Sequence, residues 1–550
     1  MPVEDRSTTG SCIVAHGFAR ATVSDLDIPA PISSESLPCP VNSLLPRYSI
    51  DPVKNAHVSV DDNRWVTKKL ISPQQEQGGS NLVMDQRNGV HFIGIGGVGM
   101  SGLARILLEG GTPVSGSDLG ENSQTRMLAA LGARIFFGHN SCNIPENTLR
   151  VVVSSAISQD NEELLEARHQ NLPVVHRSDL LAELFLDSRL GIAVAGCHGK
   201  TTVTSMIASV LVDAGQDPTC VVGGNVRILN GNARTGHSGV FVAEADESDA
   251  TFLKYFPHSA IITNIDNDHM DHYESLDSIV KAFEIFASHL DPSGTLYLCQ
   301  DDPIGRNIAL PENRRVVTYG IDKTADVMAV AVELQPFGAT FNVTIGGIHR
   351  GSFELSVPGR HNILNALPVI AFCLDLGLTI KQIRDGLKKF HGAGRRFEVK
   401  GAFDGVTVID DYGHHPNEIK ATLAAAKSLG ARRIVVVFQP HRFSRTQLLS
   451  REFGRCFDDC DKLFITDIYS ASEKPIEGVT SRLILDHMPV AQRRKTKMVK
   501  APGDALIHLM SMVESGDVVF TIGAGSVTNM GPDLIEAMRA RASQAINPAV

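Results

Sequence analysis

The chain contains 550 residues, of which 43% are hydrophobic and 20% are charged, and its formal net charge is −10. A chain of this length can form about three to four domains of ordinary size. The acidic balance argues against nucleic acid or an anionic membrane as a partner, although local basic groups can still bind anionic substrates. The sequence shows no membrane-spanning apolar stretch, no signal-peptide pattern and no C-x-x-C pair among its nine cysteines. We therefore expect a cytoplasmic protein without membrane insertion, zinc site or disulfide framework.

The first 87 residues differ in composition from the rest of the chain. Residues 1–87 are rich in Pro, Ser, Gln and Gly, show no sustained helical or strand period, and contain the single tryptophan, Trp65. A segment of this kind buries little apolar surface. We predict that it is a disordered N-terminal extension.

From residue 88 onward the chain repeats a unit of apolar strand, glycine turn and amphipathic helix. "VHFIGIG" and "LGIAVAG" each open such a unit, and "RRIVVVF" and "DVVFTIG" have the continuous apolar character of strands buried on both faces. The pattern predicts an α/β protein with parallel sheets. We place boundaries near residues 189 and 396, which divides the chain into domains of residues 88–189, 190–396 and 397–550.

A glycine-rich turn joins the first strand to the first helix. Gly94, Gly96 and Gly99 form G-x-G-x-x-G, and Asp118 follows where a dinucleotide-binding fold places its ribose-binding acid. Such a turn lets a pyrophosphate approach the backbone and the helix N-terminus. By itself the turn favours NAD or FAD, and a merely tight turn is the alternative.

A second loop, "AVAGCHGKTT", ends like a phosphate-binding loop. The usual spacing requires a glycine at position 194, where this chain has Val194. Gly196, Gly199, Lys200 and Thr201 nevertheless lie between an apolar strand and an amphipathic helix. We predict a nucleotide site in which Lys200 neutralises phosphate oxygens and Thr201 contributes a hydroxyl to Mg²⁺.

Two clusters of acids and histidines follow the next strands. The clusters are Glu244, Asp246, Glu247 and Asp249 in "EADESD", and Asp266, Asp268, His269, Asp271 and His272 in "NIDNDHMDHY". Hard oxygen ligands near a phosphate loop suit Mg²⁺. For Glu247 and Asp271 a solvated helix cap is the favoured interpretation.

Three later segments carry weaker signals. His361, Asn362 and Asn365 begin a helix, where the asparagines could read an adenine edge or simply act as an N-cap. "VIDDYGHHPNEI" places acids, a tyrosine and histidines after a strand. Arg442 and Arg445 could grip a carboxylate or phosphate through paired hydrogen bonds, although surface arginine pairs are common.

Eight segments, taken in order, resemble the Mur ligase family. They are "GIGGVGMSGLA", "GCHGKTT", "EADESD", "NIDNDHMDHY", "RHNILNA", "GAGRRFE", "DDYGHHPNEI" and "PHRFSRT". The resemblance extends from residue 88 to about residue 540 and does not include residues 1–87. It implies a Rossmann-like N-terminal domain for a UDP-sugar, a P-loop ATPase-like central domain, and a Rossmann-like C-terminal domain for an amino acid.

The resemblance also implies a reaction. An ATP- and Mg²⁺-dependent ligase would join L-alanine to the carboxylate of UDP-N-acetylmuramate through an acyl phosphate, in peptidoglycan precursor synthesis. The first glycine-rich turn would then hold the diphosphate of UDP, so the resemblance replaces the dehydrogenase that the turn alone favours. The alternatives are a ligase of the same family that adds a peptide to the same sugar, an NAD(P)-dependent oxidoreductase, and a non-catalytic nucleotide-binding module.

Individual roles follow from the same resemblance. Catalysis would depend on Lys200, Glu244, His269 and Arg396. Mg²⁺ would be held by Thr201, Glu244 and His269. ATP would be bound by Gly196, Cys197, His198, Gly199, Lys200, Thr201, Thr202, Asn362, Asn365, Arg396 and Asp411. The UDP-sugar would be bound by Gly94, Gly96, Gly97, Gly99, Met100, Asp118 and Ser155. Alanine would be bound by Tyr412, His414, Arg442 and Arg445. The family usually has Thr at the position of Cys197, so any hydroxyl contact there is lost.

Overall fold

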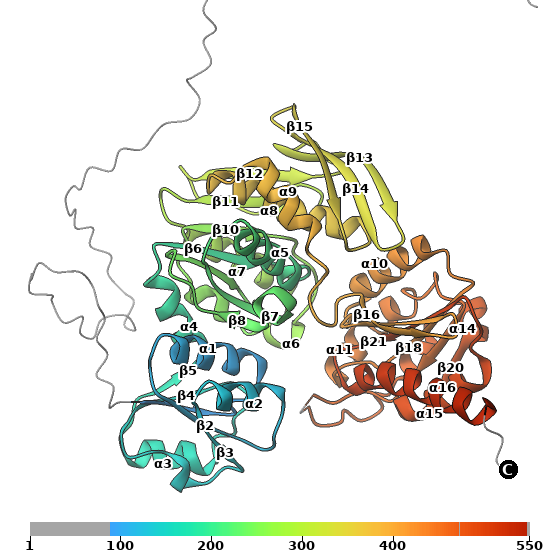
Figure 1. The fold of residues 1–550 in the computed structure, drawn as a ribbon, viewed down its shortest axis with the longest axis horizontal. Coiled ribbons are helices and arrows are strands. Elements are labelled where there is room, and N and C mark those ends of the chain that lie inside the picture. Colours follow the sequence, from blue (N-terminus) through green and yellow to red (C-terminus); the bar gives the residue numbers. More distant parts are fainter. Residues whose placement is uncertain (1–88, 472, 547–550) are drawn as a thin grey trace, which may run out of the picture. The chain divides into compact units, whose positions relative to one another are not determined.

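The structure is a computed structural model that describes residues 89–471 and 473–546. The predicted extension, residues 1–87 with Trp65, lies outside these residues. The described chain forms three sheets, each accompanied by helices (Figure 1). This architecture confirms the predicted α/β class with three sheet-containing domains.

The first sheet is wholly parallel and has the strand order β3-β2-β1-β4-β5. Its strands are β1 (Gly89–Ile93), β2 (Val114–Asp118), β3 (Arg134–Phe137), β4 (Thr148–Val153) and β5 (Val174–His176). Its helices are α1 (Val98–Glu109), α2 (Ser123–Ala130), α3 (Glu162–His169) and α4 (Arg177–Leu186). Strand order reverses beside β1, which is where open parallel sheets bind nucleotides.

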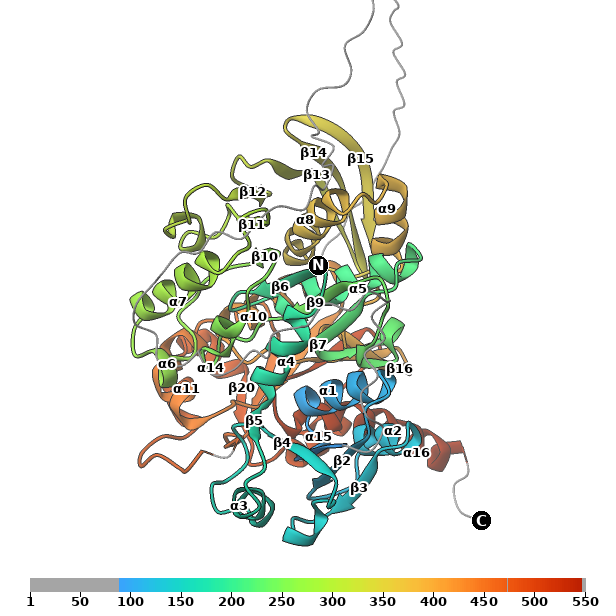
Figure 2. The same cartoon turned by 90° about the vertical axis from the view of Figure 1, so that its left-hand side faces the viewer.

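The second sheet has the order β15-β14-β13-β12-β11-β10-β6-β9-β7-β8. Its strands are β6 (Leu190–Ala195), β7 (Thr219–Val226), β8 (Gly231–Arg234), β9 (Val240–Glu244), β10 (Ser259–Ile262), β11 (Thr295–Cys299), β12 (Arg315–Gly320), β13 (Val327–Gln335), β14 (Gly338–Ile345) and β15 (Ile348–Leu355). Its helices are α5 (Lys200–Asp213), α6 (Met270–Tyr273), α7 (Leu276–Ser288), α8 (Arg360–Asp375) and α9 (Ile380–Lys388). Figure 2 shows α8 and α9 beside the antiparallel meander of β13, β14 and β15.

The third sheet has the order β16-β17-β21-β18-β19-β20, and only the β16–β17 pair is antiparallel. Its strands are β16 (Glu398–Phe403), β17 (Val406–Asp411), β18 (Arg433–Phe438), β19 (Lys462–Ile465), β20 (Thr496–Met498) and β21 (Asp517–Ile522). Its helices are α10 (Pro416–Ala426), α11 (Phe443–Leu448), α12 (Ser450–Phe453), α13 (Arg482–Asp486), α14 (Val490–Lys495), α15 (Pro502–Met512) and α16 (Met530–Ile546).

The apolar runs of this third sheet are buried on both faces. Val436 and Phe438 of β18 pack in one hydrophobic cluster, and Val435 and Val437 of the same strand pack in another. Successive side chains of a strand point to opposite faces, so helices must cover both. This explains why "RRIVVVF" lacks polar alternation.

The central sheet brings three connecting segments to one edge. β6 lies between β9 and β10 and runs parallel to both, with Val194 opposite Glu244 and Ala195 opposite Ile262. The carboxyl ends of parallel strands share an edge, which is where open α/β sheets bind ligands. The glycine loop after β6 therefore meets the acidic segments that follow β9 and β10.

Candidate active site

The loop between β6 and α5 is shaped by two glycines. Gly196 and Gly199 adopt φ values of 132° and 86°, in the region that side-chain-bearing residues rarely adopt. A Cβ on Gly196 would lie 2.0 Å from Thr263 Oγ1, so that position also lacks room for a side chain. Val194, where the usual loop has glycine, is a fully buried residue of β6. The loop, which is shorter than the usual phosphate-binding loop, therefore begins at Gly196, directly after β6 ends at Ala195.

Lys200 is the first residue of α5 and forms a buried ion pair. Its Nζ donates to Gly196 O at 2.7 Å and lies 2.7 Å from a carboxylate oxygen of Glu247. Burial would lower the pKa of Lys200, but Glu247, Asp246 and Glu244 outweigh that effect and raise it. The lysine is therefore a cation at neutral pH.

The interpretation of Glu247 as a solvated cap is wrong. Its side chain is buried, because it is the counter-ion of Lys200 and also faces His269 Nε2 at 3.4 Å. A charged group is stable in such a place only when it is paired. The pairing brings together residues 47 positions apart, which no local pattern could reveal. The side chain of Asp271 lies outside the described part of the structure.

Thr201 and Glu244 supply adjacent oxygen donors. Thr201 Oγ1 donates to Glu244 Oε1 at 3.0 Å, and the Gly223 N–H donates to Glu244 Oε2 at 2.6 Å. Burial raises the pKa of Glu244 against the lowering effect of Lys200. A hydroxyl and a carboxylate held this close are the hard-oxygen donor set that Mg²⁺ prefers, so these two residues fit the ion.

His269, the third predicted magnesium ligand, lies beside Glu247, the partner of Lys200. Its Nε2 is 3.4 Å from Glu247 Oε1 and 3.6 Å from Asp268 Oδ2, and its φ is 57°. Sparsely populated backbone conformations of this kind cluster at functional sites. The structure therefore joins His269 to the loop through Glu247, a residue that the sequence interpretation set aside.

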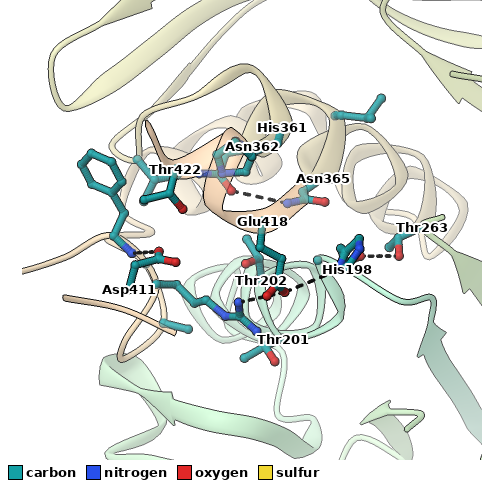
Figure 3. Close-up of a pocket in the computed structure, with 18 of the residues that line it drawn as sticks. His198, Thr201, Thr202, Thr263, His361, Asn362, Asn365, Asp411, Glu418 and Thr422 are labelled. Atoms are coloured by element: carbon teal, nitrogen blue, oxygen red, sulfur yellow. Dashed lines mark hydrogen bonds and ion pairs between the residues drawn. The ribbon is translucent and has the colours of Figure 1, made fainter. Parts of the chain in front are cut away.

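A cavity of about 220 Å³ lies beside the loop (Figure 3). Eight of the residues predicted to bind ATP line it: His198, Gly199, Thr201, Thr202, Asn362, Asn365, Arg396 and Asp411. Apolar side chains such as Tyr319, Leu364 and Phe397 also line it, and the polar residues Asn417, Glu418 and Thr422 reach it from α10. Polar groups that converge among apolar side chains are typical of a small-molecule site.

The asparagines at the start of α8 are not N-caps. Gly359 occupies the N-cap position, whereas Asn362 Nδ2 donates to Pro358 O at 2.7 Å. Asn365 Oδ1 would lie 2.7 Å from a Cβ on Gly199, so its amide lies directly over the loop. The geometry favours the ligand-binding interpretation of these residues over the cap.

Arg396 and Asp411, two of the residues predicted to bind ATP, lie close to each other near the start of the third sheet. Asp411 accepts hydrogen bonds from the backbone N–H groups of Phe397 and Gly413 at 2.9 and 2.8 Å. The Arg396 guanidinium lies over the Tyr412 ring, 5.2 Å from its centroid, and its Nη1 donates to Glu418 at 3.3 Å. Residues predicted for ATP and for alanine are thus in direct contact here.

Arg445 is buried and is paired with a residue of the central domain. Its Nε and Nη2 donate to Asp268 Oδ1 at 3.3 and 3.0 Å. Arg442, Arg445, Asp268 and His269 line one small cavity of about 30 Å³ together with residues of α11. The predicted arginine pair therefore lies beside the predicted metal ligand His269, at the point where the central and third sheets' segments touch.

The first glycine-rich turn leads into a helix that has no side-chain cap. Gly97 is the N-cap of α1, so the first N–H groups of the helix have no capping side chain. The Gly96 N–H donates to Asp118 Oδ2 at 2.8 Å. Asp118 thus orients the turn itself, in addition to the ribose contact predicted for it.

The remaining residues predicted for the UDP-sugar differ in exposure. Met100 is buried in the core, whereas Ser155 Oγ lies 3.1 Å from His176 Nε2 at the surface. Arg177 was not predicted, although its guanidinium lies 3.2 Å from the place of a Cβ on Gly99 and 3.8 Å from Asp246. Arg177 directly follows the short strand β5, "VVH", and belongs to none of the sequence motifs, so no local pattern indicated it.

A further cluster, His198, Asp266 and His415, has ligand atoms within 4.8 Å of one another. His198 Nε2 lies 2.9 Å from Asp266 Oδ2, and His415 Nδ1 lies 3.6 Å from the same oxygen. The His415 Nδ1 lone pair already accepts the Asn417 N–H at the start of α10. We therefore assign this cluster as an ion pair of His198 with Asp266 rather than as a metal centre.

In the described residues, no helix combines the length and apolarity needed to cross a membrane.

Comparison with known proteins identifies the family. Three family models match consecutive parts of the chain: "Mur ligase family, catalytic domain" over residues 89–189, "Mur ligase middle domain" over residues 194–373, and "Mur ligase, glutamate ligase domain" over residues 395–525.

The similar proteins include curated relatives and solved structures. The UDP-N-acetylmuramate–L-alanine ligase of Syntrophus aciditrophicus is 46% identical over 450 residues, which cover 82% of this chain and 93% of that protein. The enzyme of the same name from Geobacter sulfurreducens is 47% identical over 448 residues, with 80% and 96% covered.

Among solved structures, the UDP-N-acetylmuramate-alanine ligase of Thermotoga maritima aligns with a TM-score of 0.71 at 30% identity, covering 82% of this chain and 99% of that one. A murein peptide ligase from Psychrobacter arcticus shares the fold, with a TM-score of 0.63 at 24% identity and coverage of 82% and 98%. The chain therefore belongs to the Mur ligase family.

Proposed function

We propose that the chain is an ATP-dependent ligase that joins L-alanine to the carboxylate of UDP-N-acetylmuramate during peptidoglycan precursor synthesis in the cytoplasm. The observation that carries this proposal is the identity of 46% over 450 residues to a UDP-N-acetylmuramate–L-alanine ligase, spanning 93% of that relative. The glycine loop with Lys200 supports it, because ligation by this route consumes a nucleotide.

The reaction proceeds in two steps. The sugar carboxylate oxygen attacks the γ-phosphorus of ATP, and the bond to ADP breaks, which yields an acyl phosphate. The alanine nitrogen then attacks the acyl carbon, loses a proton, and the tetrahedral intermediate expels phosphate. The protein's contribution to such transfers is mainly positioning and charge stabilisation.

Lys200 and the backbone of residues 196–199 would bind the phosphates. The lysine ammonium is a fixed cation, and α5 begins at this residue, so its N-terminal N–H groups face the same place. Thr201 and Glu244 would hold Mg²⁺, with His269 as a third ligand. When bound, that ion supplies positive charge that offsets the charge on the transferred phosphoryl group.

Five sets of residues would bind the rest of the substrates. Asn362 and Asn365 would contact adenine, Asp411 the ribose, and Arg396 the phosphates. Gly94, Gly96, Gly97, Gly99, Met100, Asp118 and Ser155 would hold the UDP-sugar. Tyr412, His414, Arg442 and Arg445 would bind alanine. We assign these roles to domains of residues 88–189, 190–396 and 397–550.

The decisive experiment measures phosphate release from ATP and UDP-N-acetylmuramate with a panel of single amino acids and a tripeptide. We expect release with L-alanine and much less with the tripeptide. Release that requires the tripeptide would instead identify a peptide-adding ligase of the same family. Omitting the UDP-sugar should abolish release in every case, which controls for simple ATP hydrolysis.

A further inference from the structure

The geometry points to Glu418 as a positioning residue whose two carboxylate oxygens serve two different substrates of the proposed ligase. One oxygen aligns Arg396 and His198 for the nucleotide, and the other aligns His414 for the amino acid. The inference rests on the proposed function for the identity of those ligands. Glu418 is not among the site residues predicted from the sequence.

Oxygen Oε2 of Glu418 faces the start of its own helix. Glu418 is the third residue of α10 and forms a capping box with His415. Its Oε2 accepts the backbone N–H groups of His414 and His415 at 3.0 and 3.3 Å and lies 3.2 Å from His414 Nδ1. Tyr412 O lies 3.2 Å from that same Nδ1. Both neighbours of Nδ1 are acceptors, so the proton resides there and the ring orientation is fixed.

Oxygen Oε1 faces away from the helix, into the nucleotide cavity. It accepts from Arg396 Nη1 at 3.3 Å. It also lies 3.4 Å from Nδ1 of His198, and Figure 3 shows Glu418 and His198 side by side. The other ring nitrogen of His198, Nε2, lies 2.9 Å from Asp266 Oδ2. With a carboxylate at each nitrogen, the ring is held as an imidazolium.

The charges around Glu418 agree with this division. Burial would raise the pKa of Glu418, but His414, Arg396 and His198 hold it well below its usual range. Burial would also lower the pKa of His198, but Asp266 and Glu418 outweigh it and raise that pKa to about 9. Glu418 is 9% exposed at its side chain, so solvent screens these interactions little.

The partners of Glu418 come from three separate segments of the chain. His198 belongs to the loop before α5, Arg396 to the link before β16, and His414 to the turn after β17. One carboxylate therefore connects groups proposed for ATP with a group proposed for alanine. Removing its charge should affect the two substrates unequally, because each oxygen has different partners.

The substitution Glu418→Gln separates the two oxygens. The amide oxygen should remain at the Oε2 position, because two backbone N–H groups and the His414 Nδ1–H all donate there. Gln also completes a capping box, so α10 keeps its cap. The amide NH₂ then faces Arg396 and His198, which are donors themselves, and both lose their acceptor.

We expect the KM for ATP of Glu418→Gln to rise on the order of tenfold, the scale of losing charge-assisted hydrogen bonds. The KM for alanine should change by less than about twofold. Glu418→Ala removes both oxygens and should raise both KM values. In ligand-free protein, the His198 ring should titrate near pH 9 in the wild type and closer to 6.5 in Glu418→Gln. Histidine NMR signals measure this, and His198→Asn identifies the resonance.

The matched control is Asp504→Asn. Asp504 Oδ2 accepts the N–H of Ala501, the N-cap residue of α15, at 3.0 Å, at a partly exposed position outside both cavities. This variant makes the same change from carboxylate to amide at a helix cap. It should leave both KM values, the His198 titration and the thermal unfolding midpoint unchanged.

Two results would overturn the inference. Unchanged ATP KM and His198 titration in Glu418→Gln would show that the carboxylate does not hold these groups. Equal rises in both KM values, together with a lower unfolding midpoint, would show that Glu418 only maintains the helix. If the wild type shows no alanine-dependent phosphate release, the proposed function fails, but the His198 titration and calorimetric ATP affinities of the same variants still decide the role of Glu418.

Discussion

Lys200 and Glu247 form a buried ion pair beside the glycine loop that we propose binds phosphate. Both side chains are largely buried, with 13% and 1% of their surfaces exposed. In the proposed site a nucleotide phosphate would compete with Glu247 for the ammonium, whereas without the nucleotide the carboxylate keeps the lysine charged and in place. Breaking one partner of a buried pair leaves an uncompensated charge.

We predict that Lys200→Ala lowers the ligation rate by about 10² or more, the scale of removing one preorganised charge from a transition state. Binding of the UDP-sugar should be almost unaffected, because the proposed sugar site lies in another domain. Steady-state phosphate release and calorimetry with UDP-N-acetylmuramate measure these effects. Lys281→Ala, which removes an exposed lysine from α7, is the control. Near-normal turnover in Lys200→Ala would refute the nucleotide-loop assignment.

Arg445 has a structural partner in addition to its proposed ligand. Its two hydrogen bonds to Asp268 use one edge of the guanidinium, and a lysine ammonium cannot reproduce this planar arrangement. Asp268 precedes His269, so the arginine also borders the proposed metal site. Arginine pairs are common at protein surfaces, but Arg445 is buried, whereas Arg442 is partly exposed.

We predict that Arg445→Lys raises the KM for L-alanine by about tenfold, consistent with losing a charged hydrogen bond, and leaves the KM for ATP almost unchanged. Kinetics with each substrate varied in turn measure the split. Arg482→Lys, at an exposed pair on α13, should behave as wild type. A shifted ATP dependence with normal alanine dependence would place this arginine in the phosphate site instead.

At the scale of elements, the glycine turn before α1 is determined by close packing. A Cβ on Gly96 would lie 2.5 Å from Asn122 Nδ2, 2.8 Å from Asp118 Oδ2 and 2.9 Å from Thr125 Cγ2. These neighbours belong to the end of β2 and the cap of α2, so they have little freedom to move. The turn and the helix N-terminus that it opens are thus fixed by residues more than twenty positions away.

We predict that Gly96→Ala distorts this turn and weakens binding of UDP-N-acetylmuramate by about tenfold or more, the scale of misplacing hydrogen-bond donors by a fraction of an ångström. ATP affinity should not change. Calorimetric titration with each ligand tests both statements. Gly120→Ala is the control, because a Cβ at Gly120 meets nothing within 4 Å. Equal losses for both nucleotides would point to general unfolding.

At the scale of the whole molecule, the matched relatives define where the catalytic unit lies. The family models begin at residue 89, and 450 aligned residues account for 93% of the Syntrophus aciditrophicus relative but for 82% of this chain. Contacts such as Asn417 with Asp266, at 2.6 Å, and Arg445 with Asp268 join the third sheet's segments to the central domain without residues 1–87. All the proposed site residues, from Gly94 to Arg445, lie within the described residues.

We predict that a chain starting at residue 88 keeps its fold and its ligase activity, because a segment without apolar periodicity contributes little burial. Comparing the thermal unfolding midpoint and kcat of the full and shortened chains tests this. In the full chain, Trp65 emission should be typical of exposure to water and insensitive to ATP. A blue-shifted emission that responds to ATP, or loss of activity on shortening, would show that residues 1–87 contribute to the site.

Much of the fold and the loop positions could be predicted from local patterns. Continuous apolar runs predicted strands buried on both faces, and each glycine turn predicted a strand-to-helix junction, because these preferences act between residues close in sequence. The residues of β13–β15, in contrast, gave no prediction. That meander is stabilised by pairing between neighbouring strands, and its exposed face lacks the apolar signal of the parallel strands.

The sequence by itself determined the three-domain α/β class, the placement of Lys200 and Thr201 at the start of a helix and that of Glu244 at the end of a strand, because short-range periodicity and glycine positions specify these features. Only the tertiary structure decided which charges are paired. Glu247 pairs with Lys200, 47 residues away in the sequence, and Asp268 pairs with Arg445, 177 residues away. Glu418 lies between His198 and Arg396. Such pairs form because the sheet topology brings distant segments to one edge, where burial makes an unpaired charge too costly to remain.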